Sequence, residues 1–156
     1  MGISPSFPGN PRQKHQFLVR VNGIDGAWFQ KATLPSVEND IDEFNPAGST
    51  RATKFSGRRV VGECTLEKGV PADAPDLAAW NWLTAATNSQ TGELGDPVVY
   101  KQDVEICETD RVGRVIQTWR LLGAFCSKIE WSDLEGGSSE HIVETLTLTV
   151  DDVEVL

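Results

Sequence analysis

The chain has 156 residues and a formal net charge of −9, with 39% hydrophobic and 24% charged residues. This length fits one domain and is too short for two full domains with a linker, while five Trp and six Phe provide large side chains for a core. Disorder throughout the chain is therefore excluded. The acidic balance argues against a protein that grips nucleic acid, because such proteins need a basic surface. No stretch approaches the ~18 consecutive apolar residues that cross a bilayer, so no membrane insertion is expected.

The first expected element is an extended N-terminal arm over residues 1–13. Pro5, Pro8 and Pro11 interrupt it, and it lacks the apolar run of a secretory signal. Residues 14–156 are expected to form a single domain.

Two strands, at residues 15–21 and 27–34, are expected to pair as a hairpin across the turn residues between them. A weaker alternation covers residues 36–44. A long loop is expected at about residues 44–58. It is the most basic part of the chain, and loops of this length inside a domain are usually functional or mobile.

One helix is expected, at about residues 75–87, where Asp76 suits the positive end of the helix dipole. Trp80 and Trp82 are two residues apart and cannot share a helix face, so we expect one in the core and one at an interface. Further strands are expected at residues 60–68, 98–108, 114–122, 124–131 and 142–150. About eight strands without β-α-β alternation predict an antiparallel β-barrel or sandwich with one flanking helix.

The residue patterns of metal sites are missing from the sequence. His15 and His141 lie near opposite ends of the chain, and residues 39–43 lack the spacing and the glycine of a calcium loop. The three cysteines, Cys64, Cys107 and Cys126, are odd in number and widely separated, so we expect buried free thiols in a reducing cytoplasm. No metal and no cofactor are predicted.

Catalytic patterns are also missing. Ser138 and Ser139 lie close to His141, but the segment runs from a loop into a strand and is not a nucleophile elbow. Neighbouring carboxylates such as Asp103 with Glu105 are expected by chance in a chain with 23 acidic residues. We therefore predict no catalytic residues and no enzyme.

The last strand is expected to bury Leu146 and Leu148 and to present Thr145, Thr147 and Thr149 on its other face. Such a polar face fits either an ordinary half-solvated sheet or the lining of a water-filled channel.

The order of these signals resembles the tail tube protein family of contractile-tailed bacteriophages, which is related to the inner tube proteins of extracellular contractile injection systems. The resemblance spans roughly residues 17–155. It is carried by the segments HQFLVRVNG (15–23), WFQKA (28–32), CTLEKG (64–69), AWNW (79–82), WRLLGAFCSK (119–128) and ETLTL (144–148).

The resemblance implies a structural subunit whose hexameric rings stack into a hollow tube, enclosed by a contractile sheath, that conducts DNA into the host. It implies as partners the chain itself, the sheath protein, the baseplate and tail-terminator proteins, and DNA that passes without specific binding. It places the protein in the virion tail, after synthesis and assembly in the host cytoplasm. The alternatives are the inner tube protein of a contractile injection system, a tube initiator or terminator, and a soluble β-barrel enzyme or ligand-binding module.

Two groups of residues are candidates for assembly and transport. The subunit-interface candidates are Arg51, Lys54, Arg58, Arg59, Glu38, Asp40 and Asp42. The basic ones are expected to meet carboxylates of an adjacent subunit, either at residues 38–43 or near Asp151 and Asp152. The lumen-lining candidates, taken from faces expected to be free of Lys and Arg, are Asp103, Glu105, Thr145, Thr147 and Thr149.

Overall fold

The computed structural model describes residues 16–21, 24, 26, 29–70, 75–87, 92–137 and 141–156, so the expected N-terminal arm lies outside the described residues. Nine strands and two helices lie in this described part. The strands are β1 (Gln16–Arg20), β2 (Phe29–Thr33), β3 (Val37–Phe44), β4 (Thr53–Val61), β5 (Cys64–Gly69), β6 (Gln102–Thr109), β7 (Val115–Trp131), β8 (Val143–Thr149) and β9 (Asp152–Val155). The helices are α1 (Ala78–Ala86) and α2 (Pro97–Tyr100).

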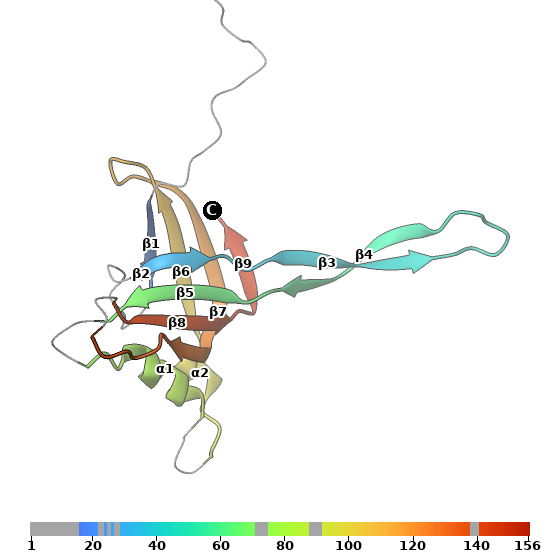
Figure 1. Cartoon of the computed structure of the whole chain (residues 1–156). Coiled ribbons are helices and arrows are strands. Elements are labelled where there is room, and N and C mark those ends of the chain that lie inside the picture. Colours follow the sequence, from blue (N-terminus) through green and yellow to red (C-terminus); the bar gives the residue numbers. More distant parts are fainter. Residues whose placement is uncertain are drawn as a thin grey trace, which may run out of the picture.

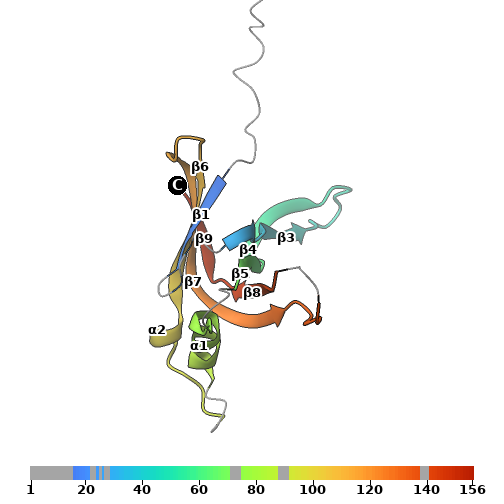
Figure 2. The same cartoon turned by 60° about the vertical axis from the view of Figure 1, so that its left-hand side comes forward.

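Seven strands form one antiparallel sheet in the order β1-β6-β7-β8-β5-β2, with β9 added alongside β7. The expectation that the first two strands pair as a hairpin is wrong, because β1 pairs with β6 and β2 with β5, at opposite ends of this order. In Figure 1, β1, β6 and β9 run upright while β2, β5 and β8 run across, so the sheet folds into two layers, also seen in Figure 2. We call them the upright layer and the cross layer.

Strand β7 belongs to both layers. Its first half pairs with β6 and β9, and its second half pairs with β8. Gly123 lies between the two halves with a φ of 62°, a conformation that favours glycine. The two strands expected at residues 114–122 and 124–131 are therefore one bent strand of 17 residues.

The core lies between the layers, because alternate side chains of each strand point inward. On β8, Leu146 and Leu148 are fully buried, while the three threonines between and beside them are partly exposed. The predicted orientation of this strand is confirmed. Val104 and Leu121 complete the core from the upright layer, both at 0% exposure. The predicted antiparallel sandwich is thus confirmed, as an open sheet rather than a closed barrel.

The flanking helix is confirmed as α1, which lies within the predicted range. Trp82 is buried and its Nε1 donates a hydrogen bond to the carbonyl of Tyr100 at 2.7 Å, whereas Trp80 is 43% exposed. The expectation that only one of the two reaches the core is confirmed.

The prediction that a strand begins at Val98 is wrong for its first residues, because residues 97–100 form the helix α2. Pro97 occupies the first turn, and the side chain of Asp96 accepts a hydrogen bond from the N–H of Val98. Both features favour a helix start over a strand. The pairing in this region begins only at Gln102.

The expected long loop at residues 44–58 is also wrong in large part. β4 begins at Thr53, directly opposite Phe44, so only residues 45–52 connect β3 to β4. The two strands form a separate two-stranded sheet that projects from the body in Figure 1. We call it the projecting hairpin (Val37–Val61).

Three smaller findings complete the fold. The three cysteines are buried and unbonded, as predicted. β9 was not expected, because four residues next to an acidic pair carry little strand signal on their own. No helix within the described ranges is long and apolar enough to span a membrane.

Candidate assembly surfaces

The projecting hairpin exposes nearly all of its side chains. Every residue of β3 is exposed, as is every residue of β4 except Gly57 and Val61. Its large apolar side chains are far from buried: Ile41 is 67% exposed, Phe44 59% and Phe55 57%. Because an isolated two-stranded hairpin is at best marginally stable in water, this surface is suited to contact with another molecule.

The structure brings all seven predicted interface residues onto this one hairpin. Glu38, Asp40 and Asp42 lie on β3; Lys54, Arg58 and Arg59 lie on β4; Arg51 lies in the connection. The register places Asn39 opposite Arg59 and Glu43 opposite Lys54. The acidic and basic segments are therefore neighbours within one chain.

At the root of the hairpin, Arg59 Nη1 lies 2.9 Å from Asp152 Oδ1. Within the chain, Arg59 thus pairs with one of the carboxylates named in the sequence analysis, and its contact with an adjacent subunit stays a prediction. The pKa of Asp152 is lowered, first by the hydrogen bond that its carboxylate accepts from the N–H of Val153 and then by Arg59. The ion pair anchors the hairpin to β9 and leaves the charges further out free for other contacts.

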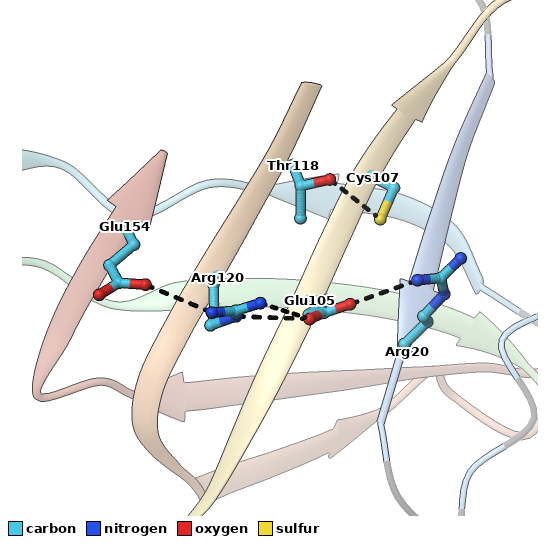
Figure 3. Close-up of polar contacts among 6 residues, drawn as sticks. All are labelled: Arg20, Glu105, Cys107, Thr118, Arg120 and Glu154. Atoms are coloured by element: carbon cyan, nitrogen blue, oxygen red, sulfur yellow. Dashed lines mark hydrogen bonds and ion pairs between the residues drawn. The ribbon is translucent and has the colours of Figure 1, made fainter. Parts of the chain in front are cut away.

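The outer face of the upright layer carries a row of alternating charges, shown in Figure 3. Glu105 lies between Arg20 at 3.4 Å and Arg120 at 3.3 Å, and Arg120 in turn reaches Glu154 at 3.5 Å. The register of β1, β6, β7 and β9 places these four residues side by side. The expectation that the face around Glu105 is free of Lys and Arg is therefore wrong.

Asp103 lies further along β6, where its Oδ1 accepts a hydrogen bond from the N–H of Gly123 at 3.2 Å. The same face also exposes apolar side chains: Leu18 is 37% exposed, and Leu156, which pairs with the backbone of Thr118, is 61% exposed.

The outer face of the cross layer is different in character. Thr147 lies between Thr65 of β5 and Lys128 of β7, and Thr145 lies between Glu67 and Glu130. None of these residues is a large exposed hydrophobic side chain. Because the two layers pack face to face, this surface and the one carrying Glu105 point in opposite directions, and the two sets of lumen candidates cannot line one surface together.

A buried ion cluster was missed from the sequence. Lys68 is fully buried and pairs with Asp76, and its Nζ lies 3.7 Å from Glu144 Oε1. Trp131 Nε1 donates to the other oxygen of Glu144 at 3.1 Å. The signal was available, because Cys64, Leu66 and Lys68 occupy alternate positions and so point to one face. The cluster ties the start of α1 to the cross layer.

No group of three or more His, Cys, Asp or Glu in the described part of the chain is placed to hold a metal ion. His15, Ser138 and Ser139, which the sequence analysis considered, lie outside the described residues.

Several solved structures share this fold. A chain in the cryo-EM structure of the anti-feeding prophage cap, described as tube-terminating, is 24% identical over 100% of this chain and 99% of its own, with a TM-score of 0.76. A chain in the sheath/tube terminator of the extracellular contractile injection system PVC is 22% identical over 96% and 99%, with a TM-score of 0.75. Hcp1 from Flavobacterium johnsoniae is 13% identical over 89% and 93%, with a TM-score of 0.55. No curated protein shows significant similarity to the chain.

Residues 13–154 match the family described as T4-like virus tail tube protein gp19, which is most of the chain and includes both layers, the helices and the projecting hairpin. The resemblance seen in the sequence is thereby confirmed, and the chain belongs to this tail tube family.

Proposed function

We propose that this protein is a structural subunit that assembles into rings, most simply hexamers, which stack into a hollow tube inside a contractile sheath. The observation that carries the proposal is the projecting hairpin, a two-stranded sheet whose Phe44 and Phe55 are left exposed by the described part of the chain. A monomer would leave this apolar surface in water, whereas a neighbouring subunit can bury it. The charged residues of the hairpin would then contact neighbouring copies. A structural role of this kind requires no catalysis.

The test is direct observation of the particles. Concentrated protein viewed by negative-stain electron microscopy is expected to show rings or tubes, and analytical ultracentrifugation is expected to show a concentration-dependent oligomer. A single species of about 17 kDa at high micromolar concentration contradicts the proposal.

We further propose that the outer face of the cross layer, which carries Thr145 and Thr147, lines the bore of the tube. A channel that passes a polyanion needs a smooth polar surface, because a single unpaired cation per subunit becomes a ring of phosphate traps. Thr65, Thr145 and Thr147 give an uncharged centre to this face, and Lys128, which lies beside Thr147, is paired with Glu130. The opposite face carries Arg20 and Arg120 together with exposed leucines, which suits contact with protein rather than with passing DNA.

This assignment is tested by labelling assembled tubes. Thr145→Cys and, as the matched comparison, Glu154→Cys are treated with a maleimide attached to a bulky polymer; the three native cysteines are buried and supply little background. Protection of position 145 in tubes but not in dissociated subunits supports the assignment. Rapid labelling of position 145 in tubes, with position 154 protected, reverses it.

A second candidate is the inner tube or tube terminator of a contractile injection system. It is favoured by the fold shared with the anti-feeding prophage cap. The first candidate places the protein in a phage virion with DNA as the cargo, and the second places it in a phage-like particle with a protein as the cargo. Micrographs of the native particle distinguish the two, because only the virion has a capsid.

A further inference from the structure

The buried ion cluster contains one more carboxylate than its cation can balance. The ammonium of Lys68 faces both Asp76 and Glu144, and the three side chains are 1%, 14% and 4% exposed. A buried charge that lacks full compensation is costly, and a buried ion pair is weak evidence for stability even when it is balanced. The surplus carboxylate therefore points to a chemical role for the cluster.

Three neighbouring strands fix the position of Glu144. The register places this residue of β8 directly opposite Lys68 of β5 on one side and Trp131 of β7 on the other. Trp131 Nε1 donates to one carboxylate oxygen at 3.1 Å, and the other oxygen, Oε1, lies 3.7 Å from Lys68 Nζ. Glu144 Oε1 is buried and accepts no hydrogen bond within the described part of the chain. It is therefore an unoccupied acceptor beside the amine of Lys68.

Asp76 presents its carboxyl group to the same amine. Its Oδ2 accepts a hydrogen bond from Lys68 Nζ, and its Oδ1 accepts one from the N–H of Ala78, in the first turn of α1, at 3.4 Å. Attack by the nitrogen on Cγ of Asp76 would place negative charge on Oδ1. The N–H of Ala78 and the positive end of the helix dipole stabilise charge at that position.

We propose that Lys68 and Asp76 condense to an amide, an isopeptide bond within the chain, with Glu144 as general base and general acid. The site holds the nucleophile, the carboxyl carbon, a proton acceptor and a donor for the oxyanion together, and such positioning supplies much of the acceleration of a reaction. This modification goes beyond the proposed tube role and does not depend on assembly.

The reaction balances within the cluster. A proton passes from the ammonium of Lys68 to Oδ2 of Asp76, which gives a neutral amine and a neutral carboxyl group, and a medium of low polarity favours neutral groups over charged ones. The nitrogen attacks Cγ, and Glu144 takes one proton from the nitrogen. Glu144 then delivers this proton to Oδ2, the Cγ–Oδ2 bond breaks, and water leaves. The products are one amide and one water, with Glu144 ionised again.

The bond would join two parts of the subunit permanently. It closes residues 68–76 into a covalent ring and fixes the segment before α1 to β5. Hydrolysis of the amide requires water, which a closed site keeps out. The start of α1 then stays on the cross layer under conditions that would open an ion pair.

The chain also contains a comparable pair that lacks the buried environment. Lys101 Nζ lies 2.9 Å from Asp151 Oδ2, but these side chains are 33% and 56% exposed. Solvated lysine and aspartate side chains are charged at neutral pH, and an ammonium cannot attack a carboxylate. We expect no bond at this pair, which serves as an internal control.

The test is the intact mass of the full chain together with its tryptic digest. The mass is expected to be lower than that of the sequence by one water. Trypsin does not cleave after a lysine whose amine is acylated, so residues 60–101 are expected as one peptide that lacks one water, with fragmentation placing the link between Lys68 and Asp76. Without the bond, residues 60–68 and 69–101 appear as separate peptides. Cleavage after Lys101 shows in the same digest that the exposed pair is unlinked.

Glu144→Gln isolates the proposed base. The amide keeps the size of the side chain and can still accept a hydrogen bond from Trp131, but it cannot carry the proton, so the full mass and cleavage after Lys68 are expected. The matched control is Glu130→Gln, which replaces an exposed carboxylate next to Trp131 in the sequence and should leave the bond intact. Circular dichroism checks that both variants fold.

Each result supports or overturns one statement. A folded wild type with the full mass and cleavage after Lys68 overturns the bond, whatever the variants show. A bond that forms equally in folded Glu144→Gln overturns the role of Glu144. Because the mass is measured on the subunit, a linked monomer contradicts only the tube function, and tubes of unlinked subunits contradict only the bond.

Discussion

The sandwich and the projecting hairpin are built from the same kinds of residues but use them in opposite ways. In the sandwich, Leu146 and Leu148 are at 0% exposure, and even a lysine is buried and paired. In the hairpin, Ile41 and Phe44 remain mostly exposed. The difference indicates that the sandwich carries the stability of the subunit, while the hairpin carries apolar surface that the described part of the chain leaves exposed. Variants in the two regions should therefore affect different measurements.

The largest expected effect on stability comes from Lys68→Ala. It leaves the buried carboxylate of Glu144 without its cation and removes the partner of Asp76. Removing one member of a buried ion pair costs about 3–5 kcal/mol. Urea unfolding of dilute protein measures this loss.

The matched control is Lys128→Ala, in which an ion pair with Glu130 is lost from an exposed surface. Exposed pairs contribute little, so its unfolding curve should lie close to that of the wild type. A similar small change in both variants would show that the buried cluster does not support the sandwich.

A slightly smaller effect is expected for Leu146→Ala. This side chain is fully buried between the layers, and truncation of such a leucine costs about 2–5 kcal/mol through lost burial and the cavity left behind. Ile41→Ala in the hairpin should change the free energy of unfolding by less than about 0.5 kcal/mol. Equal losses in the two variants would contradict the division of roles between sandwich and hairpin.

Gly123→Ala tests the bend that lets β7 serve both layers. The added Cβ would lie 2.2 Å from the carboxylate of Asp151 at a φ of 62°, so both a clash and backbone strain oppose it. We expect a loss of about 1–3 kcal/mol in urea unfolding. Gly113→Ala, at a φ of 93° with nothing near its Cβ, isolates the strain and should cost less.

The smallest effect concerns the ion pair that joins the hairpin to the sandwich. The pKa of Asp152 is below its ordinary value of 3.8 because the N–H of Val153 and then Arg59 stabilise the carboxylate. A carboxyl whose pKa is lower in the folded state stabilises the folded protein at pH values above its pKa in the unfolded chain. This stabilisation is lost as the pH falls through the pKa that the group has in the folded state. In the variant Arg59→Ala, the pKa of Asp152 should rise but stay below 3.8, because the N–H of Val153 still donates a hydrogen bond to the carboxylate. Carboxyl NMR titration measures it, and an unchanged pKa would mean that Arg59 contributes nothing.

Much of the sandwich followed from the sequence alone. Period-two alternation identified the last strand and its buried leucines, since a strand with one wet face must alternate. Helical spacing located α1 and separated Trp80 from Trp82, because residues two apart lie on different sides of a helix. The order of short motifs along the chain was enough to indicate the tail tube family.

Only the tertiary structure decided which residues meet across strands. The neutralisation of Glu105 by Arg20 and Arg120 depends on the register of β6 against both β7, the next strand in the chain, and β1, which is distant in sequence. The burial of Lys68 depends in the same way on Asp76 and Glu144 arriving beside it. Part of the basic segment at residues 44–58 became a strand of a hairpin because it pairs with β3, the strand directly before it in the chain. Local patterns determine which face of a strand is apolar, but charge pairing is a property of neighbours in space, and the chain order does not specify those neighbours.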